Sequence, residues 1–223
     1  KSNMLMIGPT GCGKTTFINL LMRFYDTDSG KISIDGVDIM DITRDNLRKC
    51  YGMVLQDSWL FNGTIMENLR YGNENATEEE VIAAAKAAYA HSFIRRMSDG
   101  YNTVISEDGG NLSQGQKQLL TIARTILADN RILILDDSTS AVDTGTDAKI
   151  RKAFREEIPG TTKIIIAQRI STVLHANQIL VLEDGRIVGK GTHAQLMESC
   201  PAYQEIARSQ LSNKELDLKG GEA

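Results

Sequence analysis

The amino-acid sequence predicts an α/β fold whose core is a mostly parallel sheet, with a helical segment inserted into that core. Short apolar runs typical of buried strands recur along the chain, for example at Asn3 to Ile7 and Ile132 to Leu135. A glycine-rich turn joins the first run to a helical segment, as in α/β cores built on parallel strands. From Asp57 to about Ala128 the pattern is mostly helical, and strand signals then return.

The individual elements follow from local patterns. The glycine-rich turn leads into a helix from Thr15 to Phe24. Two Asp-Gly pairs, Asp35-Gly36 and Asp184-Gly185, lie between apolar runs and predict hairpin turns. Capping boxes at Thr77 and Ser113 predict helix starts. The remaining strands are expected at Lys31 to Ile34, Val37 to Ile39, Tyr51 to Leu55, Lys163 to Ala167, Ile179 to Leu182 and Arg186 to Gly189.

Composition narrows the class of protein. The 223 residues carry a formal net charge of −4, without a cluster of lysine and arginine. A nucleic-acid groove therefore lacks electrostatic support, and we expect no nucleic-acid partner. The longest apolar stretches, such as Ile164 to Ala167, are too short to cross a bilayer. Three cysteines at scattered positions indicate neither a disulfide framework nor a metal site.

The glycine-rich turn matches a phosphate-binding motif, G-x-x-x-x-G-K-[ST], at every fixed position. Backbone N–H groups of such a turn converge on phosphate oxygens at a helix N-terminus. We expect Lys14 to reach the β- and γ-phosphates and the Thr15 hydroxyl to bind Mg²⁺. A chance match is disfavoured by the flanking strand and helix. The residues predicted to bind nucleotide here are Gly8, Pro9, Thr10, Gly11, Cys12, Gly13, Lys14, Thr15 and Thr16.

Two adjacent carboxylates, Asp136 and Asp137, directly follow the apolar run that ends at Leu135. The carboxyl end of a buried parallel strand lies at the ligand crevice in folds of this kind. We therefore expect Asp136 to hold the Mg²⁺ shell and Asp137 to face the γ-phosphate and its attacking water. Taken alone, the pair fits a solvated turn equally well. Together with the phosphate loop, it favours a magnesium site that includes Thr15.

A third motif is Leu112-Ser113-Gln114-Gly115-Gln116. It is a capping box that opens a helix over 114–128, and the same geometry presents the Ser113 hydroxyl and backbone N–H groups as an anion receptor. The segment resembles the L-S-G-G-Q signature of ATP-binding-cassette (ABC) proteins, with Gln114 in place of the first glycine. The resemblance implies that Ser113, Gly115 and Gln116 bind the γ-phosphate of ATP held by an opposing subunit.

Further segments resemble the family in the same order along the chain. Gln56 matches the Q-loop glutamine, which implies contact with metal and nucleotide and a part in catalysis. Ser58 to Gly63 resembles the exporter surface that receives the membrane domain. Thr103 to Gly109 resembles an exporter segment that carries a glutamate, here Glu107. Asp143 ends a segment that resembles the D-loop, which implies contact with the partner's phosphate loop.

The resemblance implies a P-loop NTPase fold with a mostly parallel core, an antiparallel β subdomain and a helical insert. It implies an ABC nucleotide-binding domain at residues 1–210, with the helical signature subdomain at 57–128 and a flexible tail at 211–223. Family members carry an earlier β segment with an aromatic residue that stacks on adenine. Because this chain starts at the phosphate-loop strand, we expect that N-terminal part of the β subdomain to be missing.

Two departures from the family pattern predict slow hydrolysis of ATP. The residue after the magnesium aspartate is normally glutamate, but here it is Asp137, whose carboxylate is drawn back by roughly 1.5 Å. A misplacement of about 1 Å can lower a rate 10²-fold. The switch histidine is replaced by Gln168, which can hydrogen-bond a phosphate but cannot carry a positive charge. His91, His175 and His193 do not occupy the switch position, so we expect surface or packing roles for them.

The resemblance implies an exporter component with ATP and Mg²⁺ as cofactors. Its partners would be a second nucleotide-binding domain, paired head to tail, and a transmembrane domain fused N-terminally. The chain would then lie at the cytoplasmic face of a membrane. Because the signature at Ser113 is retained while Asp137 and Gln168 weaken the chain's own site, we expect a heterodimer rather than a homodimer.

Two other functions stay open. An ATP-binding regulatory subunit that hardly hydrolyses ATP would carry the same substitutions at Asp137 and Gln168. A soluble, non-transporter ABC ATPase of the chromosome-maintenance kind shares the motifs. That class separates its phosphate loop and signature by a very long coiled coil, which the spacing between Lys14 and Ser113 disfavours.

Overall fold

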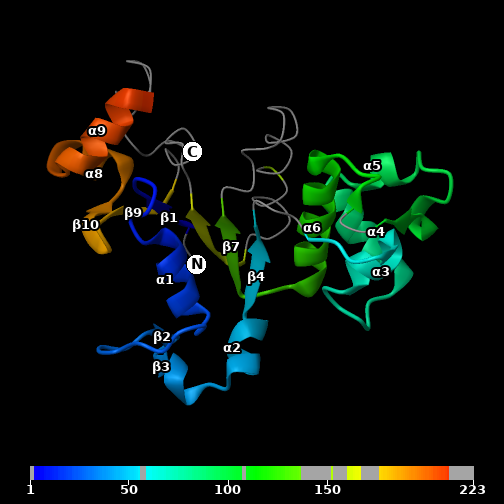
Figure 1. The fold of residues 1–223 in the computed structure, drawn as a ribbon, viewed down its shortest axis with the longest axis horizontal. Helices are drawn as coiled ribbons and strands as arrows, with labels where there is room; N and C mark the ends of the chain where they lie inside the picture. The colour runs from blue at the N-terminus through cyan, green and yellow to red at the C-terminus, as the bar shows by residue number, and fades with distance from the viewer. Residues whose placement is uncertain are drawn as a thin grey trace. The chain divides into compact units, whose positions relative to one another are not determined.

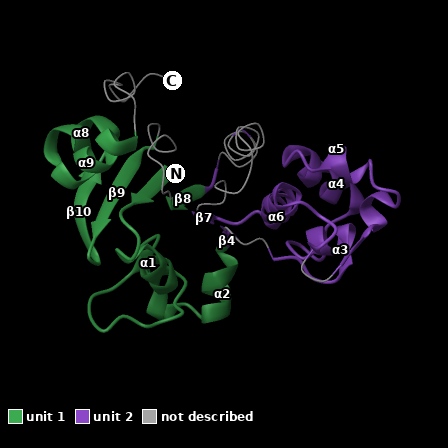
Figure 2. Cartoon of the chain, turned by 45° about the horizontal axis from the view of Figure 1, so that its top comes forward, with its two compact units in different colours: residues 1–51, 162–223 green, residues 52–161 purple. Residues whose placement is uncertain are grey.

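The computed structural model of the protein describes residues 3–55, 59–106, 109–136, 152, 160–166 and 176–210. It divides into two compact units (Figure 2). Unit 1 comprises residues 1–51 and 162–223, and unit 2 comprises residues 52–161. The predicted tail at 211–223 lies outside the described residues.

Unit 1 is built on a mostly parallel group of strands (Figure 1). β1 (Asn3–Ile7) lies between β8 (Thr162–Ile166) and β9 (Gln178–Glu183) and is parallel to both. β10 (Arg186–Gly191) pairs with β9 in the antiparallel direction. The predicted α/β class with a mostly parallel sheet is therefore confirmed.

Both faces of these strands are covered by apolar packing, as expected for parallel strands. On one face, Leu5, Ile7 and Val181 pack against α8 (His193–Ser199) and α9 (Pro201–Gln210). On the other face, Met6, Cys12, Leu180 and Leu182 form a second cluster that Phe17 of α1 covers. The alternation of side chains along each strand sends neighbouring residues into different clusters.

The helix after the phosphate loop, α1 (Lys14–Leu21), is shorter than the predicted span from Thr15 to Phe24. It ends because Arg23 adopts a left-handed backbone conformation, with φ 53°. The Arg23 guanidinium donates hydrogen bonds to the carbonyl oxygens of Ile39 (3.3 Å) and Ile42 (3.1 Å). These long-range partners fix the end of the helix, and no local pattern predicts them.

Both predicted Asp-Gly turns are confirmed, because each pair has positive φ angles that suit a two-residue hairpin turn. The first hairpin is shorter than predicted, with β2 (Ser33–Ile34) and β3 (Val37–Asp38). Its second strand ends because the Asp38 carboxylate accepts the Met40 N–H (2.9 Å) and opens a 3₁₀ helix at Ile39–Asp41. α2 (Arg44–Lys49) follows, capped by Thr43.

Unit 2 is mostly helical, as the sequence predicts for the middle of the chain. Its helices are α3 (Ile65–Arg70), α4 (Glu78–Ala87), α5 (His91–Ile94) and α6 (Gln114–Ala128), with a 3₁₀ turn at Gly100–Asn102. α6 packs on α3 and α4, and its Leu120 and Ile122 are buried. Among the helices in the described ranges, none combines the length and the hydropathy needed to cross a bilayer.

The strands of unit 2 are short. β7 (Ile132–Asp136) neighbours β4 (Tyr51–Val54), which begins at the boundary of the unit. β5 (Gly63–Thr64) pairs with β6 (Val104–Ile105) in the antiparallel direction, a long-range pairing that the sequence did not indicate because both strands are two residues long.

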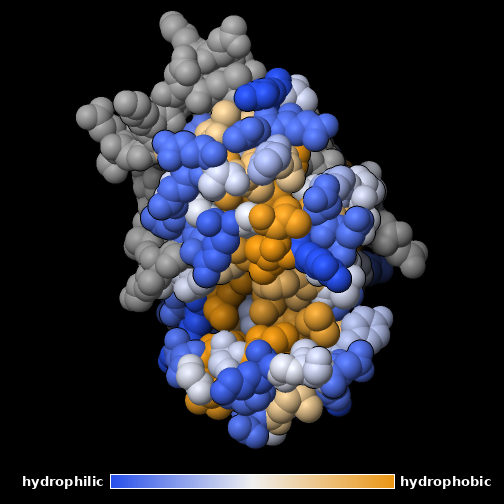
Figure 3. Space-filling view, turned by 90° about the vertical axis from the view of Figure 1, so that its left-hand side faces the viewer, coloured by the Kyte–Doolittle hydropathy of each residue, from blue (hydrophilic) through white to orange (hydrophobic). Residues whose placement is uncertain are grey.

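An apolar hollow lies along α1 in unit 1. Phe17, Leu20, Leu21 and Ile32 line a cavity of about 430 Å³. On the face of the molecule seen in Figure 3, apolar side chains gather in a hollowed strip with polar side chains on either side. Val37 and Ile187 are further apolar residues of unit 1 that are about half exposed. Within the described residues, this unit therefore leaves apolar surface uncovered.

The capping box at Thr77 yields a stability prediction. Its hydroxyl accepts the Glu80 N–H (3.3 Å), and the Glu80 carboxylate accepts the Thr77 N–H (2.8 Å). Thr77→Ala removes the first bond and should cost about 1 kcal/mol at the start of α4. Hydrogen–deuterium exchange should then be faster in the first turn of α4. Thr77→Ser should keep the exchange slow, and equal exchange in all three proteins would contradict the prediction.

Candidate functional site

The phosphate loop runs from the end of β1 to the start of α1 in unit 1. Gly11 and Gly13 both have positive φ (80° and 104°), and the Cys12 N–H donates to the Pro9 carbonyl oxygen (3.2 Å). Gly13 is the N-cap of α1, so no side chain there accepts from the first backbone N–H groups of the helix. No acidic side chain lies in that first turn. The helix start is therefore suited to an anion.

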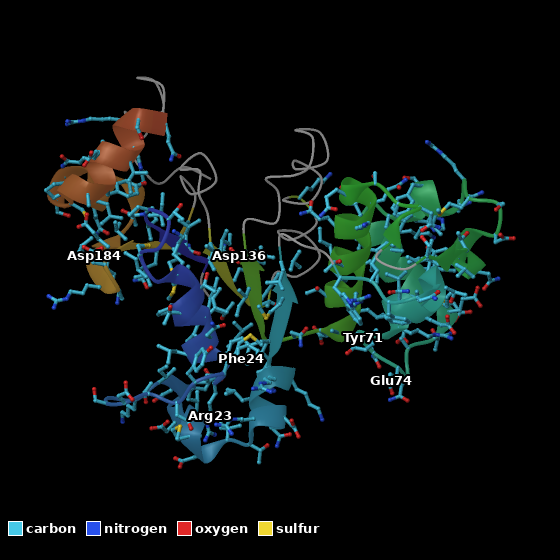
Figure 4. All side chains as sticks on the ribbon, viewed as in Figure 1. Arg23, Phe24, Tyr71, Glu74, Asp136 and Asp184 are labelled. Atoms are coloured by element: carbon cyan, nitrogen blue, oxygen red, sulfur yellow. The ribbon has the colours of Figure 1, made fainter. Side chains whose placement is uncertain are left out.

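The phosphate loop packs against the end of β9 and the turn between β9 and β10. A Cβ on Gly8 would overlap the Leu182 carbonyl oxygen and lie 2.6 Å from the Cys12 sulfur. The Gly185 N–H donates to the Cys12 carbonyl oxygen (3.0 Å). Asp184, labelled in Figure 4, has φ 47° and forms this turn with Gly185. The sequence predicts a hairpin turn at Asp184 and Gly185 but does not indicate the contact of Gly185 with the phosphate loop.

Lys14 closes the loop on itself. Its Nζ donates to the carbonyl oxygens of Gly8 (2.6 Å) and Pro9 (2.8 Å) and lies 3.6 Å from the Cys12 sulfur. The side chains of Thr15 and Thr16, in the first turn of α1, are exposed. The structure thus brings the predicted nucleotide-binding residues of this segment together in one loop and one helix start.

Asp136, labelled in Figure 4, is the last residue of β7. It is half-buried, whereas the preceding Leu135 is buried. It belongs to unit 2, and the phosphate loop belongs to unit 1. Several predicted residues lie outside the described residues, so their roles stay predictions: Gln56, Ser58, Glu107, Asp137, Asp143 and Gln168.

The signature segment starts α6, as predicted. The Ser113 hydroxyl accepts the Gln116 N–H (3.2 Å), and the Gln116 side-chain oxygen accepts the Ser113 N–H (2.9 Å). The predicted capping box is therefore confirmed. Leu112 is buried and anchors the turn, while Ser113 is exposed. Because the cap uses the hydroxyl oxygen only as an acceptor, the hydroxyl proton can still be donated to an anion.

A family model described as ABC transporter matches residues 1–140, well over half of the chain. The chain belongs to the ABC transporter family. It contains the ATP-binding domain of that family, and the resemblance seen in the motifs is confirmed. The degenerate character of the site is not addressed by this match and stays a prediction.

Three proteins similar to this ABC domain are all much longer than this chain. The uncharacterized ABC transporter ATP-binding protein YfiC of Bacillus subtilis is 51% identical over 208 residues, which are 93% of this chain and 34% of YfiC. The fatty acid ABC transporter ATP-binding/permease protein of Mycobacterium bovis is 50% identical over 208 residues, 93% of this chain and 33% of that protein. The structure of a bacterial Atm1-family ABC exporter with ATP bound matches with TM-score 0.89 and 43% identity, covering 95% of this chain and 37% of that one. This ABC domain spans about a third of the length of these relatives.

Two of the three histidines have packing roles in the ABC domain, as predicted. His193 is buried, with its Nδ1 2.8 Å from the hydroxyl of Tyr203. His91 makes the same contact with Tyr101 (2.8 Å), and burial together with Lys86 and Arg95 lowers the pKa of His91. His175 lies outside the described residues.

Unit 2 of the ABC domain also carries an aromatic patch, defined as Trp59, Phe61 and Tyr71. The ring centroids lie 5.9 to 6.2 Å apart, and Trp59 and Tyr71 are about 60% exposed. Sequence reasoning included Trp59 and Phe61 in the surface at 58–63 but missed Tyr71 and the two polar residues beneath the patch, Asn68 and Arg124. The close spacing of Trp59 and Phe61 was the signal that the sequence offered for this patch.

The crowding at Gly8 yields a binding prediction. Gly8→Ala places a Cβ against Leu182 and forces the phosphate loop to move. We expect ATP affinity to fall at least about tenfold, equivalent to 1.4 kcal/mol. Isothermal titration calorimetry measures the affinity directly.

The matched control is Gly189→Ala in β10, where a Cβ would lie 2.6 Å from the Cys200 sulfur, away from the loop. It should lower stability but keep ATP affinity. The prediction is wrong if the two variants lose ATP affinity equally, or if Gly8→Ala binds ATP as the unmodified protein does.

Proposed function

We propose that this chain is the nucleotide-binding domain of an ABC exporter, which binds Mg-ATP and uses ATP hydrolysis to power transport. The observation that carries the proposal is the phosphate loop, with an α1 N-terminus that no side chain caps, Lys14 at its carbonyls and two exposed threonines. These groups suit a nucleoside triphosphate with a bound cation. The relatives named as ATP-binding, and the similar exporter solved with ATP bound, support ATP as the nucleotide.

The predicted metal ligands fit Mg²⁺. Thr15 supplies a hydroxyl, Asp136 a carboxylate and Gln56 an amide oxygen, and hard oxygen donors of these kinds suit this ion. When bound, the ion neutralises charge on the β- and γ-phosphates. Lys14 exchanges the carbonyl oxygens that it contacts in the described structure for phosphate oxygens, which are better acceptors for an ammonium group.

Catalysis at this site is slow in our proposal. Asp137 is the base for the attacking water, and Gln168 and Gln56 position the γ-phosphate and the metal. A well-placed general base contributes about 10² to 10⁴-fold to a rate, and the short Asp137 side chain forfeits part of it. Gln168 adds a hydrogen bond but no positive charge. An essentially non-hydrolysing regulatory subunit is the second candidate, because the same two substitutions favour it.

Two chains pair head to tail in this proposal. Ser113, Gly115 and Gln116 bind the γ-phosphate on the partner's loop, and Asp143 contacts that loop. The exposed Ser113 hydroxyl at the start of α6 supports this role. A partner with an intact glutamate and histidine would complete one fast site with this signature, so we propose a heterodimer.

The membrane partner docks on unit 2. The exposed Trp59 and Tyr71 support a docking surface for the transmembrane domain. The relative named as an ATP-binding/permease protein, of which this chain spans 33%, supports fusion of such a domain to this one. The N-terminal side for that domain is what the family resemblance implies. The chain then acts at the cytoplasmic face of a membrane. The nucleotide-binding domain at 1–210, its insert at 57–128 and the tail at 211–223 are part of the same proposal.

Restoring the family residues tests the slow-site proposal. We expect Asp137→Glu/Gln168→His to raise steady-state ATPase at least about tenfold, because a correctly placed base and a cationic switch return together. The measurement compares phosphate release by the double variant and by the unmodified protein at saturating Mg-ATP.

Equal and substantial rates in both proteins would show that Asp137 suffices, and the slow-site proposal would fail. A rate near zero in the unmodified protein, with recovery in the double variant, would favour the regulatory subunit.

A charge placed in the signature tests the pairing. Gly115→Asp puts a carboxylate in the first turn of α6, where it repels a γ-phosphate presented by a partner. We expect ATP binding at the chain's own phosphate loop to persist while ATP-dependent pairing, followed by light scattering, is lost. Ser92→Asp, on an exposed position of α5, should preserve both properties. Pairing that survives Gly115→Asp would argue against a signature role for this segment.

A further inference from the structure

Arg124 lies beneath the aromatic patch and bonds to three oxygens of another segment. Its Nε donates to the Asn68 carbonyl oxygen (2.8 Å), and its Nη1 donates to the Trp59 carbonyl oxygen (3.2 Å). Its Nη2 donates to the Asn68 side-chain oxygen (3.0 Å). The guanidinium carbon also lies 5.3 Å from the centroid of the Tyr71 ring. One side chain of α6 therefore contacts the backbone or ring of two members of the patch.

Asn68 extends the network to the rest of the patch loop. It is fully buried in α3. Its side-chain oxygen accepts the Phe61 N–H (3.1 Å), and its Nδ2 donates to the carbonyl oxygens of Phe61 (3.0 Å) and Thr64 (3.1 Å). Arg124 and Asn68 thus fix both the aromatic patch and the segment that leads into α3.

The charge on Arg124 makes this arrangement costly to disturb. Within the described part of the chain, no ion pair involves Arg124, and burial lowers the pKa of its guanidinium. Arg124 is partly buried, and two carbonyl oxygens, one amide oxygen and an aromatic face replace part of its solvation. A buried cation without these acceptors would carry the full desolvation penalty. The patch and Arg124 therefore move together rather than separately.

Arg124 also belongs to the helix that begins at the signature. Gln114 and Arg124 are on the same helix, separated by a rise of about 15 Å. Gly72, next to the patch, packs so closely on this helix that a Cβ there would overlap the Arg124 carbonyl oxygen. A displacement of the patch is therefore passed to α6, and a rigid helix carries it to Ser113.

We propose that Arg124 is a positioning residue that couples the aromatic patch to the signature end of α6. This inference rests on the proposed function of Ser113, which is to bind a partner's nucleotide. Binding of a partner's nucleotide at the signature then moves Trp59 through Arg124. Docking of the membrane domain at the aromatic patch in turn changes the position of Ser113.

Trp59 allows a direct test because it is the only tryptophan of this chain. The full-length protein, with 5-fluorotryptophan in place of tryptophan, is studied by ¹⁹F NMR, and the loss of one signal in Trp59→Phe assigns the resonance. Mg-ATPγS is the nucleotide probe. The variant is Arg124→Lys, which keeps the charge but not the planar fork of donors. The matched control is Arg70→Lys, which changes another partly buried arginine of unit 2, bonded to the Ala76 carbonyl oxygen.

We expect Mg-ATPγS to shift the Trp59 resonance in the unmodified protein and in Arg70→Lys. In Arg124→Lys, the resonance should be displaced before nucleotide is added, and the nucleotide-dependent shift should be lost. Its affinity for Mg-ATPγS should stay unchanged, because Arg124 does not belong to the phosphate loop. A full nucleotide-dependent shift in Arg124→Lys would overturn the proposal.

A second variant covers the case in which Arg124→Lys does not fold. Asn68→Asp gives Arg124 a counter-ion but removes the donor to Phe61 and Thr64, so the Trp59 response should again be reduced. An unaltered response in Asn68→Asp would also overturn the proposal. If the unmodified protein does not bind Mg-ATPγS, the proposed function fails instead. The nucleotide-free displacement of Trp59 in Arg124→Lys then still decides whether Arg124 positions the patch.

Discussion

The close approach of two backbones organises unit 1. The carbonyl group of Leu182 lies so near Gly8 that no side chain fits between them. This contact lets the phosphate loop rest directly on the β9–β10 turn, and the Gly185 N–H bond to the Cys12 carbonyl oxygen closes the contact. Because the turn follows a strand that is parallel to β1, the sheet itself sets the position of the loop. The anion-binding shape is therefore a property of the strand packing as much as of the motif.

In unit 2, hydrogen bonds keep the exposed aromatic patch in a defined position. An exposed patch has few apolar neighbours to hold it. Here the backbone under the patch is fixed by hydrogen bonds from Arg124 and Asn68 instead. Hydrogen bonds in a partly buried site favour one geometry, whereas apolar contacts alone tolerate several. The patch is thereby tied to the helix that carries the signature.

The sequence predicted those parts of the molecule whose causes are local. The loop between Gly8 and Thr15, the Asp184-Gly185 turn and the capping box at Ser113 each depend on residues that are neighbours in the chain. The predicted end of α1 was wrong because the Arg23 side chain donates a hydrogen bond to a carbonyl group far along the sequence. The Arg124–Asn68 hydrogen bonds join residues 56 positions apart, so no periodicity or motif predicts them. The catalytic assignments at Asp137 and Gln168 concern residues outside the described part of the chain.

The Lys14 ammonium group has two roles, and this affects the choice of an inactive variant as a reference protein. The ammonium group expected to meet phosphate also bridges the Gly8 and Pro9 carbonyl oxygens. Truncating it to alanine would leave those carbonyl groups without their donor and would allow the loop to relax. A nucleotide-binding defect in such a protein would then combine a lost charge with an altered loop shape. Lys14 therefore supports the shape of the loop as well as binding phosphate. Its removal changes the loop in addition to removing one phosphate contact.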